Sequence, residues 1–116
     1  FLNLSAITDH LINENRDVLI LCAGWKNKFN LEDTLFAGAL ADNLLNENGF
    51  NTICDSTLAS QDLWRMASGD LTGYIQKAAQ RDRLRKNKLD DVIEYCLERD
   101  LTRVIPVLKD DYLIKL

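Results

Sequence analysis

Histidine, proline and glycine are scarce in this sequence, and their scarcity limits the chemistry available to it. The chain has one histidine, His10, one proline and five glycines among 116 residues. A single histidine excludes phosphohistidine catalysis and any histidine-rich metal cluster within the chain. The patterns G-x-x-x-x-G-K-[ST], G-x-S-x-G and H-E-x-x-H are absent, and Lys28 stands where a C-x5-R phosphate loop starting at Cys22 needs arginine. Catalysis must therefore use carboxylates, amides, backbone groups and basic side chains.

Long apolar runs are also missing. No stretch reaches the ~18–20 apolar residues that a membrane-spanning helix needs, and residues 1–7 lack the basic flank and long apolar region of a secretory signal. The three cysteines, Cys22, Cys54 and Cys96, include no C-x-x-C pair, which argues against a disulfide framework and a zinc site. We expect all three to be buried in a protein of the reducing cytoplasm.

Composition and charge are those of an ordinary soluble domain. Apolar residues make up 47% of the chain and charged residues 28%. The net charge of −4 gives no general electrostatic reason to expect binding to nucleic acid or to an anionic membrane. The length suits one compact domain. Because the first residue is Phe1 and not methionine, we expect the chain to be part of a longer protein.

Hydrophobic periodicity predicts helices that alternate with strands. Residues 18–23 form a continuous apolar run, which is typical of a central strand covered on both faces. Trp64 is expected in the core, and Asp70 is expected to cap a helix. The predicted helices cover residues 4–13, 31–46, 56–67, 71–79 and 89–97, the last capped by Asn87, and the predicted strands cover residues 18–23, 50–54, 103–108 and 112–116. This order predicts a single layered α/β/α domain over residues 1–116, with a mixed sheet that is incomplete without an N-terminal half.

The segment from residue 18 to residue 45 is the first candidate site. A strand, a loop containing Gly24 and a helix N-terminus together form the arrangement that binds anions in α/β proteins. Glu32 and Asp33 fall in the first turn of the helix, where they can hold Mg²⁺ directly or through water. The alternative is a capped helix whose acidic residues only complement the helix dipole.

The second candidate is a basic cluster. Six of the fourteen lysines and arginines lie within twelve residues: Lys77, Arg81, Arg83, Arg85, Lys86 and Lys88. Arginine is well suited to binding phosphate or sulfonate oxygens through two nitrogens. A solvated helix end and an interface with an acidic partner are the alternatives. Trp25, in the loop, could form a pocket wall or pack against a neighbouring domain.

Several motifs resemble those of the 2-phosphosulfolactate phosphatases. Cys22, Ala23 and Gly24 match a C-A-G turn, and residues 32–39 match the "EDtlxAGA" start of the following helix. Weaker matches follow in the family's order, at residues 1–6, at Arg83 and Leu84, at residues 90–96 and at residues 104–106. The resemblance covers essentially the whole chain and identifies it as the C-terminal half of such a protein.

The resemblance implies a cytoplasmic, Mg²⁺-dependent phosphatase that hydrolyses 2-phospho-3-sulfolactate, a step toward coenzyme M, or a related small phosphate ester. On this basis Glu32 and Asp33 are the expected catalytic and metal-binding carboxylates, while Asn3, Gly24 and Arg83 are expected to bind the ligand.

Two departures from the family's pattern qualify this expectation. Ala79 and Gln80 occupy the positions where the family often has a Ser–His pair. The D-V-L-R-A-T-S-like and N-G-T motifs of the family's N-terminal half are absent, so the chain alone should be inactive. The alternative function is a non-catalytic paralogue or fragment that serves as an anion-binding or protein-interaction domain.

Overall fold

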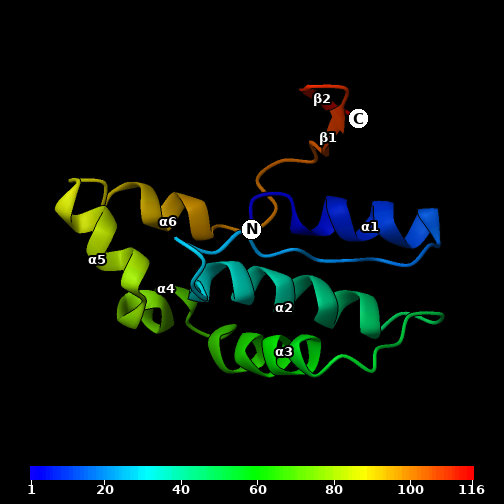
Figure 1. Ribbon diagram of the computed structural model, residues 1–116, viewed down its shortest axis with the longest axis horizontal. Coiled ribbons are helices and arrows are strands. Elements are labelled where there is room, and N and C mark those ends of the chain that lie inside the picture. The colour runs from blue at the N-terminus through cyan, green and yellow to red at the C-terminus, as the bar shows by residue number, and fades with distance from the viewer.

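A computed structural model describes the whole chain from Phe1 to Leu116. The architecture is α/β, mainly helical with a small two-stranded sheet (Figure 1). In chain order the elements are α1 (Leu4–Glu14), α2 (Leu31–Leu45), α3 (Asp55–Ala67), α4 (Leu71–Tyr74), the 3₁₀ helix η1 (Ile75–Lys77), α5 (Ala79–Lys86), α6 (Val92–Leu97), β1 (Pro106–Lys109) and β2 (Tyr112–Lys115). None of these helices is long and apolar enough to cross a membrane.

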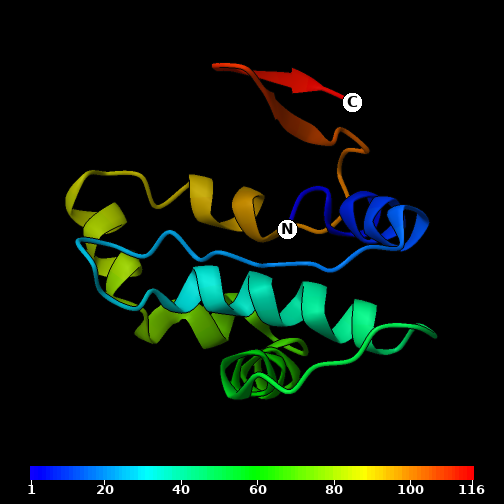
Figure 2. The same ribbon diagram turned by 45° about the vertical axis from the view of Figure 1, so that its right-hand side comes forward.

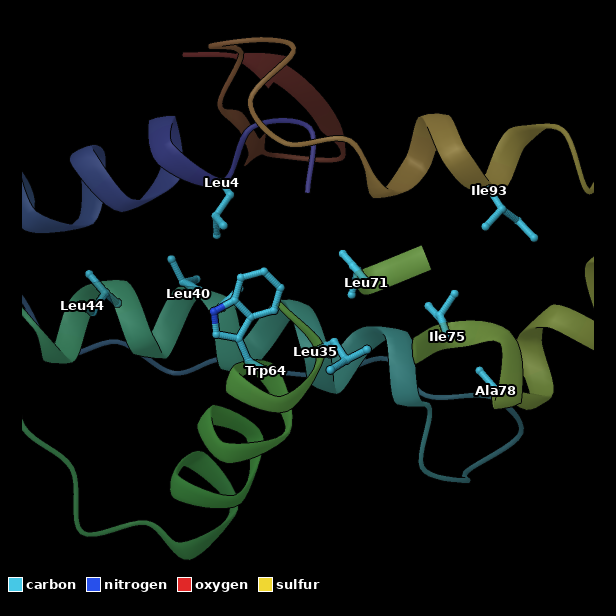
Figure 3. Packing of buried hydrophobic residues seen from close by; sticks show 11 residues of the cluster. Leu4, Leu35, Leu40, Leu44, Trp64, Leu71, Ile75, Ala78 and Ile93 are labelled. Carbon is cyan, nitrogen blue, oxygen red and sulfur yellow. The ribbon is translucent and has the colours of Figure 1, made fainter. Parts of the chain in front are cut away.

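Helix α2 lies at the centre of the fold. It runs between α1 on one side and α3 on the other (Figure 1), and it contributes Leu35, Leu40 and Leu44 to the core. Trp64 of α3 packs into the same cluster, as Figure 3 shows, so its predicted core position is confirmed. Because α2 is covered on two sides, most of its apolar residues are buried. The residues at its N-terminus are therefore carried by a firmly packed helix.

The small residues in the middle of α2 allow close packing. In the structure Gly38 lies against α3. A Cβ atom added to Gly38 would overlap the carbonyl oxygen of Ser60 and would lie 2.9 Å from the Cβ of Trp64. Glycine at this position therefore sets the separation of α2 and α3.

The prediction of a buried central strand at residues 18–23 is wrong for this chain. The segment is extended, but none of its backbone groups forms a backbone hydrogen bond. Val18 and Ile20 pack against the core cluster, whereas Leu19 and Leu21 are 91% and 88% exposed. A continuous apolar run shows that both faces of a segment are apolar. It does not show that residues of the same chain pack against both faces.

The other predicted strands are shorter or unpaired. Residues 50–54 are extended and lack a partner, and Ile53 is fully exposed. At the C-terminus an antiparallel hairpin is confirmed, but β1 begins only at Pro106, where the missing N–H costs no ladder bond, and it includes Lys109. The hairpin stands away from the helices (Figure 2).

The helices after Gly69 differ from the prediction. Asp70 caps as expected, since its side chain accepts a hydrogen bond from the Gly73 N–H at 2.9 Å. The single helix predicted over residues 71–79 is not continuous: α4 passes directly into η1, and Ala78, in an extended conformation, separates η1 from α5. Asn87 ends α5 and does not cap the next helix, which begins only at Val92. Periodicity alone did not reveal these breaks, since apolar spacing continues across them.

The cysteine prediction is also wrong, because Cys22, Cys54 and Cys96 are all exposed. All three are free thiols, as expected. Each follows an apolar run, but two of those runs are the unpaired extended segments, which expose one of their faces.

Candidate functional site

The loop before α2 is tied to the first turn of that helix. Gly24 has a φ of +68°, a backbone conformation that favours glycine, and its N–H donates a hydrogen bond to Asp33 Oδ2 at 2.7 Å. A Cβ atom at Gly24 would lie only 2.6 Å from the carbonyl oxygen of Lys28. Both features require glycine. They bring the predicted residues Gly24 and Asp33 together, and Asp33 Oδ1 is not used in this hydrogen bond.

A tight turn completes the loop. Trp25 and Lys28 exchange two backbone hydrogen bonds of 3.0 Å, and the residues between them, Lys26 and Asn27, both have positive φ. Two consecutive positive φ values are typical of a type I′ turn. The turn holds the Trp25 ring near α5, where the guanidinium carbon of Arg83 lies 5.0 Å from the ring centroid.

Arg83 of α5 faces the N-terminus of α2. Its Nη2 atom donates a hydrogen bond to Asn30 Oδ1 at 3.0 Å and lies 3.9 Å from Glu32 Oε1. Its Nε atom donates to Gln80 Oε1 at 2.8 Å, which fixes the orientation of the guanidinium. Arg83 is therefore positioned by neighbours on two helices and stacked on Trp25, and the geometry joins both candidate sites of the sequence into one.

The start of α2 has unused hydrogen-bonding capacity. The side chain of Asn30, at the N-cap position, makes no capping bond because it is engaged with Arg83. The N–H groups of Leu31, Glu32 and Asp33 form no backbone hydrogen bond. The second oxygen of Glu32, Oε2, is buried and has no partner. A cationic side chain, free N–H donors and an unpartnered carboxylate oxygen thus meet within one helical turn.

The predicted site residues divide into two groups. Gly24, Glu32, Asp33 and Arg83 surround the N-terminus of α2. Asn3, by contrast, donates a hydrogen bond from its side chain to the Val104 carbonyl at 2.9 Å, so it fastens the start of the chain to the C-terminal segment. No hydrogen bond joins Asn3 to the other four residues.

Three other cations of the basic cluster have partners elsewhere. Arg81 forms an ion pair of 2.6 Å with Asp90, Arg85 lies 3.7 Å from Asp82 on its own helix, and the ammonium of Lys77 lies 3.6 Å from the centroid of the Tyr74 ring. Within the cluster, Arg83 is thus the cation placed at the start of α2.

A metal ion would find only part of its ligand set here. No group of three or more histidine, cysteine, aspartate and glutamate side chains is arranged to hold a metal. Mg²⁺ is often held by one or two carboxylates, with waters and phosphate oxygens completing its shell. The buried, unpartnered Glu32 Oε2 and the Asp33 carboxylate fit that limited role.

The surroundings of Cys22, including its partial burial and the Asp33 carboxylate, raise the pKa of its thiol. Partial burial raises the pKa of Cys22 above its ordinary value, and the negative charge of Asp33 raises it further. Cys22 is therefore protonated at neutral pH and is a poor nucleophile in this loop.

Sequence reasoning missed two residues of the site. Asn30 was not singled out as a site residue and Gln80 was noted only as a departure from a family pattern, yet both hold Arg83. The spacing of Gln80 and Arg83, three apart on one helix, could have indicated their contact. Nothing in the sequence indicated the contact between Arg83 and Asn30, which lie 53 positions apart.

These features define a class: an α/β protein whose acidic and basic side chains gather at the N-terminus of a central helix, behind a glycine loop. The sequence profile of the 2-phosphosulpholactate phosphatase family matches residues 1–111, and the chain belongs to that family. It corresponds to the C-terminal half of such a protein.

Individual relatives agree with the profile. The chain is 36% identical over 114 residues to a Prochlorococcus marinus protein named Probable 2-phosphosulfolactate phosphatase, and the match covers 95% of this chain and 47% of that protein. A Microcystis aeruginosa protein of the same name is 33% identical over 118 residues, covering 99% and 49% respectively. A Clostridium botulinum protein, also so named, is 28% identical over 115 residues, covering 99% and 48%. The chain therefore spans about half the length of the curated relatives it matches.

Proposed function

We propose that this chain is half of a Mg²⁺-dependent phosphatase that hydrolyses 2-phospho-3-sulfolactate, a step toward coenzyme M, or a related small phosphate ester. The enzyme class is a phosphoric monoester hydrolase. Family membership supports the reaction class, and the chemistry at the N-terminus of α2 supports the choice of an anionic substrate.

The observation that carries the proposal is the placement of Arg83 against Asn30 and Glu32. A guanidinium oriented by two side-chain amides presents its remaining N–H groups in a fixed plane, which suits the oxygens of a phosphate or sulfonate group. The free N–H groups at the start of α2 and the positive end of its dipole favour a second negative group nearby. A substrate with both a phosphate and a sulfonate has two such groups.

Glu32 and Asp33 are the residues that would hold Mg²⁺. When bound, the metal would neutralise charge on the phosphate and promote attack by water. The hydrogen bond from Gly24 to Asp33 Oδ2 orients that carboxylate and leaves Oδ1 for a ligand. Glu32 Oε2 is buried without a partner, so a cation or a proton donor at this position would satisfy its unused capacity.

In the proposed reaction a water molecule attacks phosphorus, and the bond between phosphorus and the ester oxygen breaks. A proton goes to the departing alkoxide, and the products are inorganic phosphate and the free hydroxy acid. Arg83 holds one anionic group of the substrate in place throughout. Gly24 holds the loop against the ligand site through its hydrogen bond to Asp33.

The intact enzyme is proposed to be a cytoplasmic, layered α/β/α protein. The extended residues 18–23 and 50–54 would be strands of its sheet, and the N-terminal half would complete the pocket. The exposed Leu19 and Leu21 support a second layer over the sheet. We accordingly expect residues 1–116 alone to be inactive.

Phosphate release by the full-length protein, with 2-phospho-3-sulfolactate and a set of small phosphomonoesters, tests the proposal. We expect turnover that requires Mg²⁺ and is abolished by Glu32→Gln combined with Asp33→Asn. The double variant should keep its fold, apart from ~1 kcal/mol lost at the helix start. Glu98→Gln, a change outside the site, is the matched control. Absence of turnover on every ester, or an unchanged double variant, would contradict the proposal.

The second candidate function is a non-catalytic anion-binding or interaction domain. The absence of the family's Ser–His pair at Ala79 and Gln80 favours it, since a proton-transferring histidine is then missing. Gln80 instead holds Arg83. Phosphate binding that depends on Arg83, measured by calorimetry in a full-length protein without turnover, would establish this alternative.

A further inference from the structure

A groove of about 970 Å³ lies between two extended stretches of the chain. Residues 15–20 form one wall and residues 49–54 the other, while Ala41, Leu44 and Leu45 of α2 lie between them. Figure 2 shows the first wall following α2 along its length. The groove is separate from the cluster around Arg83, none of whose residues lines it.

Both walls have the side-chain pattern of strands. Val18 and Ile20 face the helices while Leu19 is exposed, and along the second wall Thr52 is more buried than Asn51 and Ile53. An alternation with period two is the mark of a pleated segment with one covered face. The backbones are therefore already in the conformation that a sheet requires.

Apart from those of Asn15, Phe50 and Cys54, the backbone hydrogen-bonding groups of both walls are unused. No backbone N–H or C=O of residues 18–23 or 51–53 forms a backbone hydrogen bond. Adjacent strands lie about 4.8 Å apart and bond to each other. The two walls do not bond to each other, and a groove separates them. An exposed pair of strand edges is a template for one more strand, which could bond to both walls at once.

The connection between the walls supports the same geometry. An extended segment, helix α2 and a second extended segment follow one another, which is the order of a β-α-β unit. In such units the helix crosses over one face of the sheet, so both strands can belong to one parallel sheet without being neighbours. The place between them is then filled by a strand from elsewhere.

Nothing within residues 1–116 can fill that place. The two strands of the chain pair with each other, and none of their residues lines the groove. The matched relatives are about twice as long as the match, which leaves just over half of each outside it. We infer that the groove between residues 15–20 and 49–54 receives a β-strand from the N-terminal half of the protein. This strand bonds to both walls and makes them members of one sheet.

Hydrogen exchange in the full-length protein, followed by mass spectrometry, tests this inference independently of any activity. We expect amides in both walls to exchange at least about 100-fold more slowly than the exposed turn at Lys26 and Asn27, as paired strands do. Fast exchange in either wall overturns the inference, because the inserted strand must bond to both. Since the measurement uses the unaltered protein, no variant has to fold for it.

A pair of variants tests the location of the strand. Leu45→Glu places a charge in the groove, whereas Asn46→Glu places one on the neighbouring exposed position outside it. Leu45→Glu should speed exchange in both walls at least about 10-fold while amides within α2 stay protected, and Asn46→Glu should not. Equal effects of the two variants would overturn the inference. So would wall protection that disappears on dilution together with a dimer, because a second copy would then be the occupant.

Discussion

Replacing Gly38 by alanine should destabilise the protein, although alanine is the better helix former. The added Cβ atom would lie 2.6 Å from the carbonyl carbon of Ser60 and 2.9 Å from the Cβ of Trp64. Ordinary contact begins at 3.4 Å, so these atoms must retreat by about 0.8 Å (3.4 minus 2.6) and about 0.5 Å (3.4 minus 2.9). A backbone carbonyl cannot rotate away as a side chain can, so α3 as a whole has to move.

The expected change in the free energy of unfolding combines a loss in packing with a gain in helix propensity. Overpacking in a well-packed core costs about 1–3 kcal/mol, and the rigid backbone on both sides puts this site at the upper end. Separating packed surfaces by 0.5–1 Å also forfeits roughly a quarter to a half of the dispersion energy across them. Alanine returns about 1 kcal/mol through its helix propensity. We therefore expect a net loss of about 2 kcal/mol in the free energy of unfolding.

Urea denaturation of the full-length protein, followed by circular dichroism, measures this loss. Gly69→Ala is the matched control, because a Cβ atom there meets nothing within 4 Å and the backbone has no positive φ. The control should change stability by less than about 0.5 kcal/mol. A Gly38→Ala protein as stable as the parent would refute the inference that glycine sets the separation of α2 and α3.

Three further predictions concern single side chains. In steady-state kinetics, Arg83→Ala should raise the KM for a phosphate ester at least about tenfold. Arg85→Ala is the control and should leave KM unchanged, because it removes only a contact within its own helix. Hydrogen bonds from Ser56, and to a lesser extent from Thr57, lower the pKa of Cys54 to about 7. In a protein consisting of residues 1–116, the alkylation of Cys54 by iodoacetamide should therefore rise with pH and be half-maximal near pH 7. Ser56→Ala should shift that midpoint upward, and an unshifted midpoint would show that the hydrogen bond is not the cause. Asp70→Ala should cost about 1 kcal/mol by removing the cap of α4, with Asp70→Asn nearly neutral in the same urea assay.

The helices up to Ala67 and the position of the candidate site could be predicted from the sequence. The start of α2 at Leu31, the end of α3 at Ala67, the cap at Asp70 and the core position of Trp64 all depend on local signals or on strong apolar character. Gly24, Glu32 and Asp33 were found together because they are close in sequence. Local chemistry is sufficient where the partners lie within one or two turns of each other.

The predictions failed where a segment depends on chain that is not adjacent to it. Residues 18–23 have the apolar run of a central strand. A strand also needs neighbouring strands to pair with, and these come from other parts of the folded protein. The breaks between α4, η1 and α5 were also missed, because the apolar spacing runs through them. The exposure of Cys22 and Cys54 follows from the same unpaired segments.

The sequence by itself determined the family, the alternation of helices with apolar extended segments, and an acidic helix start behind a glycine loop. Each of these features depends on residues that are close in sequence, so residue type and spacing are enough to predict it. Only the tertiary structure placed Arg83 on Asn30, beside Glu32, and left Glu32 Oε2 buried without a partner. It alone revealed the groove beside α2 with two unpaired walls. These features join residues tens of positions apart, and folding brings them together through packing around α2, which no local pattern encodes.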